Sequence, residues 1–131
     1  MRLLLLAGLL LAASPAPFPA WAQRPGPHDG LYQGQRFQEC TRGGGRVARE
    51  QLSAEVRNNR ISIPGLPGDP MLEGDIAADG KVNLPPFGLF GAGTGQIYEG
   101  PNNARRFTGT HPGRGDCRVS YELLRQRPVV R

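Results

Sequence analysis

The chain has 131 residues, of which 38% are hydrophobic, and carries a formal net charge of +5. This length accommodates one domain with one modest hydrophobic core and excludes a larger, multidomain architecture. Arginine supplies almost all of the positive charge, since Lys81 is the only lysine, and the accompanying 19 glycines and 13 prolines favour codon bias over selection for binding phosphates or carboxylates.

The first 22 residues have the order of a secretory signal peptide. Arg2 gives a positive start, residues 3–13 are almost entirely apolar, and the segment ends in Ala20-Trp21-Ala22. The small residues Ala20 and Ala22 predict cleavage after Ala22, which makes Gln23 the first mature residue. An apolar run of about eleven residues is too short to span a bilayer, which takes about twenty. We therefore expect a periplasmic or secreted protein with no transmembrane span in the mature chain.

Cys40 and Cys117 are the only two cysteines. In an exported chain, an even number of cysteines predicts a disulfide. A redox pair favours Cys-x-x-Cys spacing, and a metal site needs more ligands than His28 and His111 add. We therefore expect a structural disulfide, no metal site and no cofactor.

Residues 23–29 contain a Pro-Gly-Pro run and are expected to form a flexible N-terminal arm. From residue 30 onward, short β-type runs are separated by turn residues. This pattern predicts a single β domain over residues 30–126, preceded by the signal peptide, 1–22, and followed by a C-terminal tail, 127–131.

Three hairpins are predicted within the domain, each with alternating apolar residues on both sides of a turn signal. The first turns at Asn58-Asn59, because asparagine tolerates the positive φ that a tight hairpin turn needs. The second turns at Asp79-Gly80, the strongest short hairpin signal in the chain, and the third turns between residues 100 and 103. A last strand over residues 117–123 places its apolar residues on one face.

Residues 46–57 also fit the apolar spacing of a helix. A strand from about Gln51 is favoured, because the Asn58-Asn59 turn and the Ile-Ser-Ile run after it make sense only as a hairpin. A helical turn before Gln51 remains an open alternative.

About eight short strands, joined mostly to their sequence neighbours, predict an all-β antiparallel meander that closes into a small barrel or folds over as a sandwich. Cys40 ends the first strand and Cys117 begins the last. The disulfide is therefore expected to join the two ends of the sheet, where closure is otherwise weakest.

The glycine-rich loop from Pro85 to Gly95 contains Phe87, Leu89 and Phe90. These side chains either plug one end of the barrel, which is the favoured interpretation, or form a contact loop for a partner. The glycines at 91, 93 and 95 look like part of a phosphate loop, but a strand follows them where a phosphate loop needs a helix.

No residue pattern predicts catalysis. No serine stands in a Gly-x-Ser-x-Gly context, and His28 in the arm and His111 before Pro112 in a turn have no pre-organised neighbourhood. Arg114-Gly115-Asp116 matches an adhesion tripeptide, but it falls where a turn is expected anyway.

The basic C-terminal half does not predict a nucleic-acid site. Arg105 and Arg106 point to opposite faces of a strand. A nucleic-acid site interleaves basic residues with exposed aromatics, and the mature chain has no tryptophan and few tyrosines. An anionic envelope surface is the better target for these arginines.

A recurring layout of turn glycines, apolar residues and cysteines runs through most of the mature chain. It consists of Gly30-Leu31-Tyr32-x-Gly34, Cys40, Glu73-Gly74-x-Ile76-x-x-Asp79-Gly80, Phe107-x-Gly109-Thr110 and Cys117-x-Val119-x-Tyr121. It resembles small exported proteins of Gram-negative, GC-rich bacteria that carry no assigned function. It is also similar to avidin-like and lipocalin-like barrels, but avidin-like proteins line their site with several tryptophans. Trp21 is the only tryptophan and leaves with the signal peptide, which argues against biotin-type binding.

We expect an exported, non-catalytic binding or envelope-associated module whose contact surface is the loop over residues 85–95. The alternative is an inhibitor or chaperone-like partner of another exported protein, acting through that loop or through an exposed strand edge; a small hydrolase ranks last. A small-molecule carrier predicts an interior cavity, whereas a protein partner predicts a filled interior and an exposed apolar patch. An enzyme predicts that His111 reaches a carboxylate or hydroxyl in a cleft.

Overall fold

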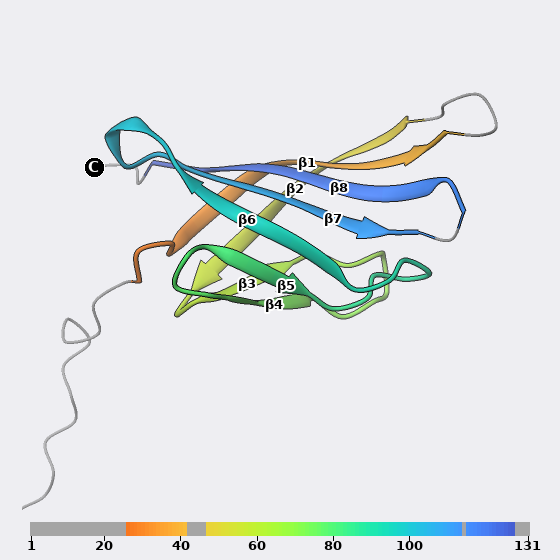
Figure 1. Cartoon of the computed structure of the whole chain (residues 1–131), viewed down its shortest axis with the longest axis horizontal. Helices are drawn as coiled ribbons and strands as arrows, with labels where there is room; N and C mark the ends of the chain where they lie inside the picture. The colour runs from red at the N-terminus through yellow and green to blue at the C-terminus, as the bar shows by residue number, and fades with distance from the viewer. Residues whose placement is uncertain (1–25, 42–46, 114, 128–131) are drawn as a thin grey trace, which may run out of the picture.

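The computed structural model describes residues 26–41, 47–113 and 115–127. The predicted signal segment, with Ala20, Ala22 and Gln23, lies outside these residues. Eight antiparallel strands form a closed barrel in which each strand pairs with its sequence neighbours and the last pairs back onto the first (Figure 1). The prediction of an all-β antiparallel meander is confirmed, and the barrel is the form that it takes.

The strands differ in length, so that the wall of the barrel is longer on one side than on the other. Their bounds are β1 Gly30–Cys40, β2 Val47–Arg57, β3 Arg60–Ile63, β4 Leu72–Ile76, β5 Lys81–Leu84, β6 Gly93–Glu99, β7 Arg105–Pro112 and β8 Cys117–Arg125. The short strands β3, β4 and β5 cover only one end of the long strands β1, β2, β7 and β8 (Figure 1). No helix among the described residues is long and apolar enough to cross a bilayer.

Alternate side chains on every strand point into the barrel, as the period of two along a strand requires. On β4 and β5 the buried residues alternate with exposed ones without exception. The inward side chains fill the interior as one core. Its buried apolar members are Tyr32, Leu52, Ala54, Val56, Ile61, Ile63, Leu72, Ile76, Val82, Leu84, Phe87, Ile97, Phe107, Val119, Tyr121 and Leu123.

Two inward glycines make room for this core. Gly95 and Gly109 are register partners on β6 and β7, and a Cβ added at Gly95 would lie 2.5 Å from a ring carbon of Phe107. The Phe107 ring therefore covers the space that a side chain would otherwise need, and this packing requires glycine at residue 95.

The predicted turns are present. Asn58 and Asn59 connect β2 to β3 with φ values of 51° and 60°, the two positive φ angles of a type I′ hairpin turn. Gly80 has a φ of 87° in the β4–β5 turn, and Asn102 and Asn103 are left-handed between β6 and β7.

The disulfide prediction is confirmed. Cys40 and Cys117 are register partners on β1 and β8, with their Cα atoms 4.0 Å apart. The bond joins the last residue of β1 to the first residue of β8.

Two segments differ from the prediction. The sequence predicts the second strand from about Gln51, with a helical turn before it as the alternative. β2 instead begins at Val47, because residues 47–50 pair with residues 36–39 of β1. His111 lies within β7 and not in a turn, because it pairs with Val119 of β8.

Residues 26–29 of the predicted flexible arm form a turn that is bound to the barrel. The Tyr32 hydroxyl donates to the carbonyl of His28 at 2.7 Å, and the Asp29 carboxylate accepts from the backbone N–H of Asn58 at 3.0 Å. Arg125 donates to the carbonyl of Pro27 at 3.2 Å. These bonds hold the turn across the end of the barrel that carries the β2–β3 hairpin.

Candidate functional site

The buried polar residues of the barrel are concentrated at the end opposite the residue 26–29 turn. Arg36 and His111 are buried among the apolar side chains, and Arg36 is only 4% exposed. Arg36 occupies an inward position of β1, two residues beyond Gly34 and four beyond Tyr32. A charged group in such a place requires partners that replace water.

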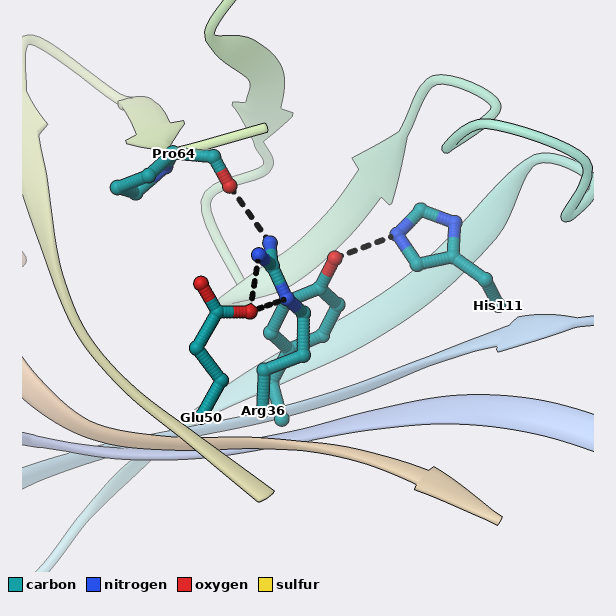
Figure 2. Close-up of polar contacts among 5 residues, drawn as sticks. Arg36, Glu50, Pro64 and His111 are labelled. Atoms are coloured by element: carbon teal, nitrogen blue, oxygen red, sulfur yellow. Dashed lines mark hydrogen bonds and ion pairs between the residues drawn. The ribbon is translucent and has the colours of Figure 1, made fainter. Parts of the chain in front are cut away.

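The guanidinium of Arg36 finds these partners on three separate segments. It donates to the Glu50 carboxylate of β2 at 2.7 and 3.2 Å and to the Pro64 carbonyl after β3 at 2.6 Å (Figure 2). The Phe87 ring lies 4.6 Å from its central carbon, a cation–π distance. One side chain of β1 thus holds β2, the β3–β4 loop and the β5–β6 loop together.

His111 bonds to the third member of the cluster, Tyr121. Its Nδ1 lies 3.0 Å from the Gly91 carbonyl and its Nε2 lies 3.0 Å from the Tyr121 hydroxyl. Because a carbonyl only accepts, Nδ1 carries the proton and Tyr121 donates to Nε2. His111 therefore holds the end of the β5–β6 loop as Arg36 holds its beginning.

Burial controls the protonation of both groups. It lowers the pKa of His111 against the opposing hydrogen bond to Gly91, and the positive charge of Arg36 lowers it further. Burial also raises the pKa of the Tyr121 hydroxyl to about 12, against the opposing charge and hydrogen bond of Arg36. The pair is neutral at neutral pH and lies in the core, so its geometry suits a structural bond better than proton transfer to a substrate.

The two loops that this cluster holds expose apolar side chains. Leu89 is 90% exposed, Met71 is 51% exposed and Leu66 is 43% exposed. Leu66 lies against the β5–β6 loop, since its Cδ1 would be 3.3 Å from a Cβ at Gly88. A crevice of about 320 Å³ separates the loops, with Met71 on one wall and Gly88 on the other. We call residues 64–71 and 85–91 together the loop platform.

The structure divides the three residues that the sequence singled out in the β5–β6 loop. Phe87 is buried beside His111, with ring centroids 5.8 Å apart. Phe90 is partly buried and packs against the core, and it pairs with Phe87 in an isolated β-bridge. Leu89, between them, points outward. The loop therefore covers one end of the core with Phe87 and exposes Leu89 to solvent.

An open strand edge lies beside the platform. β2 pairs with β1 along residues 47–56, but among the described residues it pairs with β3 only over Glu55–Arg57. Backbone groups in antiparallel strands point alternately to the two sides. The N–H and C=O groups of Arg49, Gln51 and Ser53 therefore face the side that β3 leaves open, because Pro64 ends β3.

The sequence predicted the disulfide pair and the loop of this region but missed Arg36, Glu50 and Tyr121. Arg36 left one signal, since it is a charged residue in phase with the inward positions of its strand. Among the described residues, no group of three or more His, Cys, Asp or Glu side chains is placed to hold a metal ion.

Comparison of the chain with protein-family models, with curated proteins and with solved structures gave no match.

Proposed function

We propose that this protein is an exported, non-catalytic binding module that holds an extended segment of another exported protein on the loop platform and the free edge of β2. The proposal rests above all on one observation. A buried guanidinium fixes two loops that expose leucine and methionine to solvent. Exposed apolar side chains gathered on two adjoining loops are typical of interaction sites.

The interior of the barrel supports a protein partner over an enclosed small molecule. The inward side chains pack as a single apolar core from Tyr32 at one end to Phe87 at the other. A ligand-carrying barrel instead keeps a lined cavity at its centre.

The free edge of β2 supports a partner in extended conformation. An added strand takes its affinity from main-chain hydrogen bonds and its specificity from pockets beside the edge. Arg49, Gln51 and Ser53 offer the main-chain groups, and the platform begins at Pro64, which Arg36 ties to Glu50 of β2. The edge and the apolar side chains thus belong to one surface.

The state of His111 supports binding over hydrolysis. The ring lies 3.0 Å from a hydroxyl, as an acid–base pair would, but that hydroxyl belongs to the buried Tyr121. Both groups are inaccessible to a substrate.

Capture experiments with immobilised protein test the proposal. The disulfide-bonded protein is exposed to periplasm and medium of its native host, in parallel with Leu66→Ser/Leu89→Ser and Gln51→Pro variants. Proline at residue 51 removes an N–H that faces the open edge and leaves the β1 ladder intact. We expect a captured protein that both variants lose.

Matched controls keep the edge and the general apolar surface apart. Gln51→Ala retains the edge N–H, and Leu124→Ser removes an exposed leucine of β8 on a different face. Both controls should capture as the wild type does. A protein that stays bound to the platform and edge variants, or the absence of any capture, contradicts the proposal.

A further inference from the structure

A second surface lies outside the barrel wall, away from the loop platform. A hollow of about 620 Å³ runs across the outer faces of β6, β7 and β8 and reaches β1 and β2. Its floor consists of polar side chains that are register neighbours: Thr94, Thr110, Ser120, Gln96, Thr108 and Glu122. We call this surface the threonine hollow.

Larger side chains border the short hydroxyl side chains of the floor. Phe37 follows Ser120 in register on β1 and is partly buried on the outer face, with the Arg49 guanidinium 5.6 Å from its ring. Tyr98 borders the hollow from β6 and is half-exposed. The hollow therefore combines hydroxyl and amide groups on its floor with aromatic rings at its border.

The charges of the hollow do not balance. Its two carboxylates are already paired, Glu122 with Arg106 at 2.7 Å and Glu39 with Arg118 at 2.9 Å. Lys81 at one side and Arg49 at the other also line it, and within the described ranges neither has a carboxylate partner. The threonine hollow thus presents two uncompensated positive charges.

This combination fits a sugar chain that carries acid groups. Hydroxyl and amide side chains both donate and accept hydrogen bonds, as the dense hydroxyls of a sugar require, and aromatic rings offer apolar faces to the C–H side of a sugar ring. Lysine and arginine add charge-assisted bonds to a carboxylate or phosphate. A protein partner would instead need an apolar centre, which the polar floor does not provide.

We propose that the threonine hollow binds a short acidic oligosaccharide, with Arg49 and Lys81 pairing with its acid groups. The hollow shares Arg49 with the proposed partner surface, because the Arg49 side chain lines the hollow and its main chain faces the β2 edge. Lys81 belongs to the hollow alone, and Leu66 and Leu89 belong to the platform alone, so the two proposals can be tested separately.

Titration calorimetry and amide chemical shifts test the site on the disulfide-bonded protein. The probes are tetragalacturonic acid, a phosphorylated maltotetraose and neutral maltotetraose, which separate carboxylate, phosphate and uncharged sugars. We expect one or both acidic sugars to bind, the neutral one to bind at least about tenfold more weakly, and the shifts to centre on Thr94, Thr110 and Ser120.

Charge-matched variants then separate a specific site from general attraction. Arg49→Gln/Lys81→Gln should weaken binding about tenfold or more. Arg57→Gln/Arg60→Gln removes the same charge from exposed residues outside the hollow and should leave the affinity nearly unchanged. Thr110→Val, which keeps the shape and removes a hydroxyl, should weaken binding several-fold.

Three results overturn the inference. One is equal affinity for acidic and neutral sugars, or no binding of either. Another is an equal loss in both double variants. The third is a set of shifts centred on the loop platform. Weaker sugar binding in Lys81→Gln, with capture through Leu66 and Leu89 retained, would confirm that the two surfaces act separately.

Discussion

A guanidinium removed from water needs partners, and Arg36 obtains them from a carboxylate, a backbone carbonyl and an aromatic ring. Glu50 is itself half-exposed, so water reaches the carboxylate of the pair while the guanidinium is buried. This arrangement lowers the desolvation cost that a fully enclosed ion pair carries. At the scale of single residues, Arg36 of β1 joins β2 to both loops of the platform.

Replacing Arg36 with methionine should therefore lower the free energy of unfolding by about 2–3 kcal/mol, since several buried hydrogen bonds disappear together. Amide exchange at Asp69 and Phe90, one in each platform loop, should also become faster. Arg60→Met is the control, because its contacts with Glu73 and Asp75 are on the exposed surface and should contribute less than about 0.5 kcal/mol. Urea unfolding measures both losses. Equal losses of unfolding free energy in the two variants would show that the buried contacts of Arg36 stabilise the protein no more than the exposed contacts of Arg60.

His111 should make stability depend on pH. Burial holds the pKa of His111 below its ordinary value of 6.5, so between the two values the unfolded chain binds more protons than the folded one. This contribution to stability should accordingly be present above the ordinary pKa of 6.5 and be lost as the pH falls below it. Urea unfolding across this range measures the slope.

His111→Phe should flatten that slope, although it lowers stability overall because Tyr121 loses its acceptor. Burial and the charges of Arg105 and Arg125 lower the pKa of His28 as well. His28 therefore also contributes to the loss of stability at low pH, and His28→Asn should remove that contribution. An unchanged slope in His111→Phe would exclude His111 as the titrating group.

At the scale of strands and turns, the sequence predicted what local chemistry determines. Asn58-Asn59 and Asp79-Gly80 specify their own backbone angles, so both hairpins could be placed without any knowledge of the rest of the chain. Residues 47–50 could not, because their strand conformation comes from pairing with β1 and not from their own propensity. The role of Arg36 was also hidden, because its acceptor at Pro64 lies 28 residues away.

The disulfide acts at this same scale, since it joins the two strands that close the barrel. It spans 77 residues, and restricting an unfolded loop of that length contributes roughly 4.5 kcal/mol. Cys40→Ala/Cys117→Ala should lose stability of about that size, and the reduced wild type should unfold at the same urea concentration as the variant. A loss below about 1 kcal/mol would mean that pairing of β1 with β8 alone closes the barrel.

For the whole molecule, one closed sheet separates two chemically different surfaces. The loop platform caps one end with apolar side chains. The threonine hollow lies on the outer side of β6–β8 with polar side chains and with Arg49 and Lys81, which have no carboxylate partner among the described residues. The closed core between them is continuous and rigid. The two surfaces therefore keep a constant mutual orientation.

The bonds of the residue 26–29 turn have a further consequence. Arg125 near the close of β8 donates to the carbonyl of Pro27, and the N–H of Gln126 donates to Leu31, so both ends of the described chain meet at the pole remote from the loop platform (Figure 1). A tether or fused domain attached at residue 26 or residue 127 would lie at the end of the barrel opposite Leu66 and Leu89. Such an attachment leaves the loop platform accessible from solution.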